Sequence, residues 1–363
     1  MSLTAGIVGL PNVGKSTLFN AITKQHILAA NYPFATIEPN VGIVTVPDER
    51  VKFLTNLYNP KKTIPATFEF TDIAGLVEGA SKGEGLGNKF LSHIREVDAI
   101  CEVVRCFEDP NVTHVSGSVN PIRDAEIIDI ELMLSDLEVI ETRLNKMGKK
   151  AKLSTDKEAK KEAELLEKLQ TNLQNNIAVR DIDLTDEEKT IIKSFNLLTQ
   201  KPIIYVANVD EGELQIETEN VKKLKEYAKG SEVIVINAKI EEELSDLEDA
   251  EKEEFLKDLG INESGLDKLI KSSYKLLGLS TYLTAGKDEV RAWTYKQGMK
   301  APECAGIIHT DFERGFIKAE IMSYEDLKKY GDENKVKEAG RLRLEGKDYI
   351  MQDGDICHFR FNI

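Results

Sequence analysis

The N-terminal segment contains residue types at a spacing that suits phosphate binding. Residues 9–16 read Gly-Leu-Pro-Asn-Val-Gly-Lys-Ser and match G-x-x-x-x-G-K-[ST], between an apolar strand at residues 5–8 and a helical pattern at residues 16–23. In this setting the backbone N–H groups of the turn face phosphate oxygens, and the helix N-terminus favours the anion. Lys15 then supplies a charge near the β- and γ-phosphates, and the Ser16 hydroxyl is a ligand for Mg²⁺.

A second motif follows a later strand. Asp72-Ile73-Ala74-Gly75 comes directly after the strand-like residues 67–71. The Asp72 carboxylate is predicted to hold Mg²⁺ through water, and the N–H of Gly75 is predicted to meet the γ-phosphate during catalysis. Between the two motifs, Thr36 is the expected second hydroxyl ligand of the metal. The two motifs together predict a site for a nucleoside triphosphate with Mg²⁺.

The residues expected to orient the attacking water differ from those of Ras-like proteins. Leu76 stands where those proteins have a glutamine, which predicts slow turnover, and the glycine-rich residues 75–87 are expected to move with the state of the nucleotide. His114, in the irregular segment 111–120, is a candidate catalytic replacement, and a merely solvated histidine is the alternative. Asn12 is a candidate ligand for a monovalent cation such as K⁺.

The expected base-binding loop departs from the guanine pattern N-K-x-D. The chain has Asn208-Val209-Asp210-Glu211, so Val209 replaces the lysine and Glu211 replaces the aspartate that accepts hydrogen bonds from guanine. A misplaced carboxylate leaves guanine donors unpaired, which favours ATP over GTP. Asn208 is still expected to contact a purine edge, and Asn237 with Ala238 is expected to pack on the base. GTP binding through Asp210 or Glu211 stays an alternative.

The elements that must position these residues alternate between strands and helices. The pattern predicts a mostly parallel sheet covered on both faces by crossover helices. Strands are expected at residues 5–8, 41–46, 67–71, 99–104, 201–208 and 232–237, and helices at residues 16–23, 48–58 and 88–97.

A helical insertion interrupts this alternation. Apolar residues recur at steps of three and four, as Ile130, Met133, Leu137, Ile140, Leu144 and Met147. A second face of apolar residues follows, as Ala159, Ala163, Leu166, Leu169 and Leu173. This spacing predicts two long helices in an antiparallel hairpin. Residues 141–170 contain nine Lys or Arg against six acids, which indicates either a solvated helix face or a contact arm for an acidic partner such as RNA.

The pattern changes again near residue 279. Short strands at residues 282–284, 290–295, 316–321 and 356–361, with a helix at residues 302–309, predict a small α+β domain. Just before it, residues 241–258 hold ten acids and two lysines and are expected to form a solubilising acidic helix.

Composition limits the class of protein. The 363 residues carry 48 Lys or Arg against 63 Asp or Glu, a net charge of −15, which excludes a wholly basic nucleic-acid binder. No run approaches the ~18 apolar residues of a membrane span, and residues 1–14 do not resemble a signal peptide. The four cysteines fit buried thiols in a reducing compartment. A cytoplasmic protein with no membrane contact is expected.

The combination of motifs resembles the Obg-like ATPase (YchF) family over essentially the whole chain. The motifs that carry the resemblance are residues 9–17, 72–77, 83–87 and 208–211. Residues 284–294 and 308–317 resemble the TGS domain of that family, a ubiquitin-like β-grasp module. The implied phosphate contacts are Asn12, Val13, Gly14, Lys15, Ser16 and Thr17. The resemblance further implies Ser16 and Thr36 at Mg²⁺, Asn208 and Val209 at the base, and association with ribosomes.

The predicted fold is therefore an α/β P-loop NTPase G-domain with an inserted helical hairpin and a C-terminal TGS domain. The expected boundaries are 1–124 with 196–278 for the G-domain, 125–195 for the insertion and 279–363 for the TGS domain. The predicted function is slow, Mg²⁺-dependent ATP hydrolysis that switches conformation on the ribosome or one of its subunits. A GTPase, or a nucleotide-gated binding module with incidental hydrolysis, is the alternative.

Overall fold

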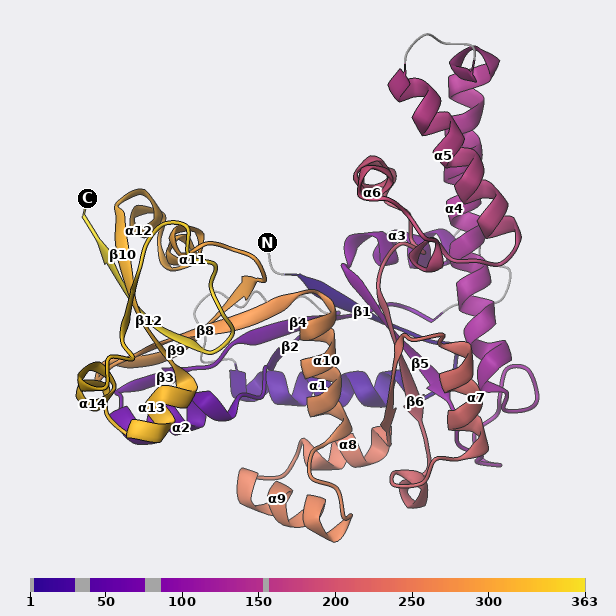
Figure 1. The fold of residues 1–363 in the computed structure, drawn as a ribbon. Coiled ribbons are helices and arrows are strands. Elements are labelled where there is room, and N and C mark those ends of the chain that lie inside the picture. The colour runs from indigo at the N-terminus through magenta and orange to yellow at the C-terminus, as the bar shows by residue number, and fades with distance from the viewer. Residues whose placement is uncertain (1–2, 30–39, 76–85, 153–156, 363) are drawn as a thin grey trace. The chain divides into compact units, whose positions relative to one another are not determined.

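The computed structural model divides into two compact units (Figure 1). It describes residues 3–29, 40–75, 86–152 and 157–362. Unit 1 comprises Met1–Ile43 and Glu69–Leu269, and unit 2 comprises Val44–Phe68 and Ile270–Ile363.

Unit 1 is built on a six-stranded sheet. The strands lie in the order β2 (Val41–Thr45), β4 (Thr67–Asp72), β1 (Thr4–Val8), β5 (Ala99–Arg105), β6 (Ile203–Asn208) and β7 (Glu232–Ile236). β4, β1, β5, β6 and β7 pair in parallel with their neighbours. Every residue of β5 and β6 is buried, as expected for strands covered on both faces. The predicted mostly parallel sheet is confirmed.

The helices of unit 1 follow the predicted alternation and then the insertion. They are α1 (Lys15–Ala29), α3 (Leu86–Glu96), α4 (Pro121–Lys152), α5 (Lys157–Gln174), α6 (Asp186–Ile192), α7 (Glu219–Tyr227), α8 (Ala238–Leu244) and α9 (Asp249–Asp258). The short 3₁₀ turns are η2 (Val179–Asp181), η3 (Lys193–Phe195) and η4 (Glu211–Glu213). α10 (Gly265–Leu276) follows them and crosses the boundary between the units.

The predicted hairpin is present as α4 and α5. Met133 and Ile140 of the first apolar face are buried against a cluster that includes Leu166, Leu169 and Leu173. Leu137, Leu144 and Met147 pack against this cluster and are partly buried.

The prediction of a buried apolar face on the first helix was wrong for one residue, Ile130. Ile130 is 43% exposed, because it lies on the part of α4 that precedes the pairing with α5 and faces a cavity instead. The helix also begins at Pro121, before the predicted start of the insertion, and residues 125–195 fall within unit 1.

The acidic segment forms two helices, α8 and α9, where one was expected. One of its acids does not face solvent. Glu241 is 3% exposed and accepts a hydrogen bond from the backbone N–H of Gly265 at 2.7 Å. Burial raises the pKa of Glu241 to about 6, so this residue anchors the start of α10 and does not add to the solubilising surface.

Unit 2 contains the predicted α+β module. Its six-stranded sheet has the order β11 (Arg343–Glu345), β10 (Phe316–Ser323), β12 (Asp355–Phe361), β8 (Leu279–Ala285), β9 (Glu289–Lys296) and β3 (Lys62–Ile64). β8 and β9 form an antiparallel hairpin, and β12 inserts beside β8 in parallel. This is the strand arrangement of a β-grasp fold, with α11 (Ala301–Ile308) as the helix that follows the hairpin. α12 (Thr310–Arg314), α13 (Tyr324–Tyr330) and α14 (Glu333–Glu338) complete the module.

The division of the chain differs from the predicted one at residues 44–68. β3 pairs in parallel with β9 at the edge of the second sheet, and α2 (Glu49–Tyr58) packs on the same module. Arg50, on α2, donates to Asp353 at 2.7 Å, and Phe53 contacts Tyr324 edge to face. These contacts place residues 44–68 with unit 2, although the sequence assigns them to the G-domain.

Two expectations from composition can be compared with the structure. All four cysteines are free and buried, as predicted. Within the described residues, the model contains no helix long and apolar enough to span a bilayer.

Candidate functional site

The predicted phosphate loop connects β1 to α1. β1 ends at Val8 and α1 begins at Lys15, and two residues between them have positive φ: Asn12 at 63° and Gly14 at 96°. A Cβ at Gly14 would lie 2.2 Å from Nδ2 of Asn208, so both the backbone conformation and this close approach require glycine.

The phosphate loop and the motif at residues 72–75 lie next to each other, because they follow the neighbouring strands β1 and β4. Asp72, the last residue of β4, pairs in register with Ile7 of β1, and its carboxylate accepts from the ammonium of Lys15. Gly75 also lies close to the phosphate loop: a Cβ added to it would be 3.3 Å from the carbonyl oxygen of Gly9. The structure therefore brings together the Lys15 ammonium, the Asp72 carboxylate and the Gly75 backbone, three of the predicted site groups.

Asn208 and Asn237 tie the base-binding loops to the phosphate loop. Asn208 is buried; its Nδ2 donates to the carbonyl of Val13 at 2.8 Å, and its Oδ1 accepts from the N–H of Ala238 at 3.0 Å. Asn237 donates to the carbonyl of Val209 at 2.7 Å and caps α8. Because both ends of the Asn208 amide are bonded within the protein, its role in this conformation is to brace the loops.

A cavity of about 210 Å³ lies beside these asparagines. Its lining consists of Asn12, Gly14, Thr17, Phe107, Asp109, Val112, Asn208, Val209, Asp210, Asn237, Ala238 and Lys239. Most of the predicted nucleotide contacts therefore share one cavity. Glu211 is not part of this lining: it is exposed at the start of η4, whereas Asp210 does line the cavity.

The wall formed by residues 107–112 was not predicted. Arg105, 2% exposed at the end of β5, donates to the carbonyls of Phe107, Asp109 and Val112 at 3.2, 3.2 and 2.9 Å. Its guanidinium also lies 4.4 Å from the centre of the Phe107 ring. One buried cation thus shapes an otherwise irregular loop against the cavity.

The chain is similar to curated proteins along its whole length. "Ribosome-binding ATPase YchF" of Bacillus subtilis (strain 168) is 62% identical, and the protein of the same name in Escherichia coli O157:H7 is 52% identical; both alignments cover all of both chains. The solved "Structure of the Schizosaccharomyces pombe YchF GTPase" is 44% identical, with a TM-score of 0.89 over 99% of this chain and 98% of that one. The chain belongs to the YchF family.

Two family models divide the chain in agreement with this result. Residues 4–146 match the model described as "50S ribosome-binding GTPase", and residues 279–362 match a YchF C-terminal model described as "Protein of unknown function (DUF933)". The predicted family and fold are confirmed. The names of the curated relatives also agree with the predicted class of enzyme, a P-loop nucleoside triphosphate hydrolase.

His114, the candidate catalytic residue, is neither solvated nor free. It is 8% exposed; its Nδ1 accepts from the N–H of Ser116 at 3.0 Å, and its Nε2 lies 2.8 Å from Oδ2 of Asp124. Since Nδ1 accepts, the proton is on Nε2 and is donated to Asp124. The neighbouring carbonyl of Thr113 accepts from Asn12 at 3.1 Å, so this segment of the YchF-family chain contacts the phosphate loop.

The remaining predicted residues divide into two groups. Ser16 is exposed on the first turn of α1, and Thr17 lines the cavity. Thr36, Leu76 and residues 83–85 of the glycine-rich segment lie outside the described residues.

The functional residues that sequence reasoning missed are Arg105 and Phe107. Arg105 is a charged residue at the end of an apolar strand, where its side chain needs buried partners. This position in the sequence was the signal that could have identified it.

Proposed function

We propose that this protein is a Mg²⁺-dependent ATPase that uses slow hydrolysis to switch conformation on the ribosome. The observation that carries the proposal is the cavity beside the phosphate loop, because Asn12, Gly14 and Thr17 of that loop line it together with Phe107 and Val209. Val209 is 1% exposed, so an aliphatic side chain replaces the lysine stem of guanine-specific loops. Glu211 lies outside the lining, which leaves no carboxylate at the guanine-reading position of that motif.

The residues present fit a magnesium ion. Mg²⁺ prefers oxygen ligands and keeps several waters, and the Ser16 hydroxyl with the Asp72 carboxylate provides one direct and one water-mediated contact. Thr36 is proposed as the further hydroxyl ligand. When bound, the ion neutralises charge on the β- and γ-phosphates. Asn12 is proposed to contribute to a K⁺ site, since Thr113 fixes its amide nitrogen and leaves the amide oxygen for a cation.

A series of contacts leads from the phosphate loop to the hairpin. Asn12 bonds Thr113, the next residue His114 bonds Asp124, and Asp124 lies in the first turn of α4. A nucleotide that displaces Asn12 therefore acts on the base of the helix that forms the hairpin. This coupling supports a switch that reports the nucleotide state to a partner.

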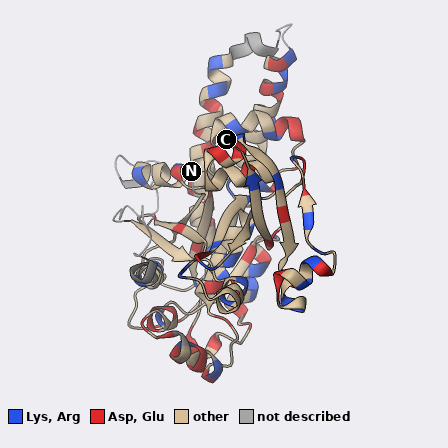
Figure 2. Ribbon diagram, turned by 90° about the vertical axis from the view of Figure 1, so that its left-hand side faces the viewer, with Lys and Arg blue, Asp and Glu red and all other residues tan. Residues whose placement is uncertain are grey.

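The ribosome is proposed as that partner because the curated relatives are named ribosome-binding ATPases. The hairpin supplies the proposed RNA contact, although much of its charge is paired. Four of the cations in residues 141–170 have acidic neighbours: Arg143, Lys160, Lys161 and Lys168. Figure 2 shows the mixture of signs along α4 and α5. RNA contact is therefore proposed for the remaining lysines near the turn.

The first experiment is a titration of ATP and GTP at fixed Mg²⁺. We expect ATP to bind at least about tenfold more tightly, a difference of about 1.4 kcal/mol. The rival reading has one specific observation in its favour, since Asp210 lines the cavity and could accept from guanine. Tighter binding of GTP, lost in Asp210→Asn but not in Glu211→Gln, would establish the GTPase and refute the proposed preference.

A second experiment separates a switch from a binding module. If hydrolysis is part of the function, added ribosomes raise the ATPase rate; an unchanged rate favours incidental hydrolysis. His114 is tested in the same assay. As a catalytic group, His114→Ala lowers kcat by about 10²-fold or more without changing the Kd for ATP. Asp124→Asn is the matched variant, because it weakens the hydrogen bond to His114 and keeps the imidazole.

A further inference from the structure

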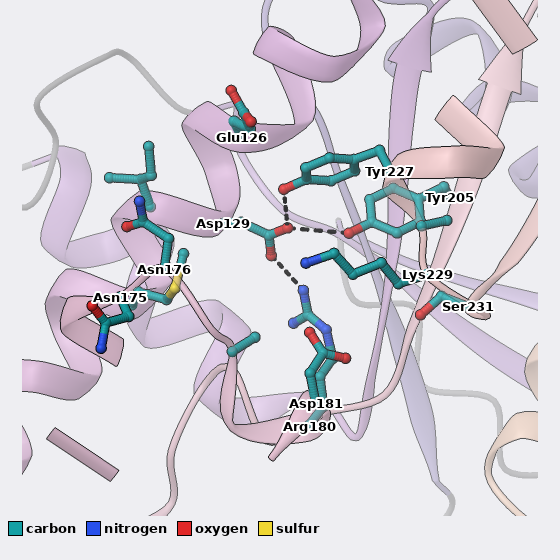
Figure 3. Close-up of a pocket in the computed structure, with 14 residues that line it drawn as sticks. Glu126, Asp129, Asn175, Asn176, Arg180, Asp181, Tyr205, Tyr227, Lys229 and Ser231 are labelled. Atoms are coloured by element: carbon teal, nitrogen blue, oxygen red, sulfur yellow. Dashed lines mark hydrogen bonds and ion pairs between the residues drawn. The ribbon is translucent and has the colours of Figure 1, made fainter. Parts of the chain in front are cut away.

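A second cavity, of about 450 Å³, opens in unit 1 beside the base of the hairpin (Figure 3). Its lining comes from α4, the residues after α5, η2, β6, and α7 with the turn that follows it. It shares no lining residue with the nucleotide cavity. Its volume lies within the range of small-molecule sites and far exceeds the space that a single buried water needs.

A carboxylate with all its bonds in use forms the centre of this cavity. Asp129 of α4 is buried; its Oδ1 accepts from Arg180, and its Oδ2 accepts from the hydroxyls of Tyr205 at 3.1 Å and Tyr227 at 2.7 Å. Burial raises the pKa of both tyrosines, so they remain donors. Asp129 therefore joins four segments: α4, η2, β6 and α7.

One cationic side chain faces the cavity with its charge unpaired, and a second is held within the protein. Arg180 is paired with Asp129, and its buried Nη1, like the carboxylate oxygens of the buried Glu102, has no hydrogen-bond partner among the described residues. Lys229, just after α7, points toward the centre of the cavity in Figure 3 and forms no ion pair with any residue of the described ranges. The unpaired ammonium of Lys229 at the cavity favours binding of an anionic group.

The rest of the lining limits the class of ligand that the cavity can bind. The carboxylates of Glu126 and Asp181 are exposed at the cavity and disfavour a second anionic group, but they suit an ammonium. Ile130 and Met133 provide an apolar surface on α4 that an apolar group of a ligand would cover, which accounts for the exposure of Ile130. The lining thus has complementary places for one anion, one cation and one apolar group.

We propose that this cavity binds a small zwitterion of the amino-acid type with an apolar side chain. Its carboxylate pairs with Lys229. Its ammonium faces Glu126, and its side chain covers Ile130, four residues further along α4. The site does not depend on the proposed ATPase activity.

The test uses the full chain without nucleotide and ligand-observed NMR. We titrate five apolar amino acids singly: leucine, isoleucine, valine, methionine and phenylalanine. The control probes are glutamate, which adds a second carboxylate, acetate, which lacks the ammonium, and isobutylamine, which lacks the carboxylate. At least one apolar amino acid is expected to bind with a submillimolar Kd, and each of the three control probes at least tenfold more weakly. Lys229→Ala should weaken binding tenfold or more.

Lys222→Ala is the matched control, since Lys222 is an exposed lysine of α7 outside the lining. The unfolding midpoint and ATP affinity of both variants are measured alongside, so that a folding defect or a failed nucleotide proposal is seen separately. No binding of any apolar amino acid to the unmodified protein would overturn the proposal. So would equal binding by the Lys229→Ala variant, or acetate binding as tightly as the amino acids.

Discussion

The contact between Gly14 and Asn208 predicts an unusual pattern of mutational effects. In Gly14→Ala the new Cβ would lie 2.2 Å from Nδ2 of Asn208, so the asparagine must move and lose its bonds to Val13 and Ala238. Each buried group left unpaired costs about 1–3 kcal/mol. The positive φ of 96° adds about 1–2 kcal/mol for any residue with a Cβ. The whole substitution is expected to cost about 3–8 kcal/mol.

A double-mutant cycle separates these two causes. In the Asn208→Ala background the hydrogen bonds are already gone, and the nearest other atom to the new Cβ is that of Ala238 at 3.5 Å, an ordinary contact. Gly14→Ala should then cost only the backbone strain, which leaves a coupling free energy of about 2–6 kcal/mol between the two positions.

Urea unfolding followed by circular dichroism, together with the Kd for ATP, measures both arms of the cycle. If Gly14→Ala costs the same in both backgrounds, the asparagine contact is not the reason for the glycine, and the bracing role of Asn208 is refuted.

Three further predictions rest on single contacts. Lys15→Ala should weaken ATP binding by about 100-fold or more, about 2.7 kcal/mol, in a titration. The unfolding midpoint should stay close to that of the parent, because among the described residues the Lys15 side chain pairs with the partly exposed Asp72. Ile140→Ala should lower the free energy of unfolding by about 2–5 kcal/mol and the exposed Ile130→Ala by no more than about 0.5 kcal/mol; equal effects in urea would contradict the assigned core of the hairpin. Burial raises the pKa of Glu241 from 4.5 to about 6, so the folded state keeps this proton longer than the unfolded state. Stability should therefore fall by about 2 kcal/mol as pH rises from about 4.5 to 6, and a Glu241→Gln variant that shows the same fall would refute this assignment.

The local motifs were predictable because their physics is local. The phosphate loop needs a strand, glycines and a helix within about twenty residues, and each was visible in the sequence. Strands β5 and β6 were equally clear, since buried parallel strands read as continuous apolar runs. The predicted apolar face of α4 was correct where it packs against α5, and it failed at Ile130, which lines a cavity.

The features that were missed depend on partners distant in sequence. β3 has three residues and pairs with β9, more than two hundred residues later, so no local pattern assigns residues 44–68 to unit 2. The burial of His114 depends on Asp124, which the sequence places in a different element. Arg105 is bonded by three carbonyls, and backbone acceptors leave no trace in residue types. The position of Glu211 outside the cavity likewise depends on the turn taken by η4.

The length of α4 has a mechanical consequence. It runs without interruption for 32 residues, about 48 Å at 1.5 Å per residue, from the turn that holds Asp124 to the far end of the hairpin. A tilt of about 5° at its base would carry its far end by about 4 Å, roughly the spacing between neighbouring residues along an extended chain. If the contacts from Asn12 to Asp124 transmit a movement beside the phosphates to the base of α4, as the proposed switch requires, the length of this helix would enlarge that movement at its far end. The bending stiffness of α4 would then set how much of the movement arrives there.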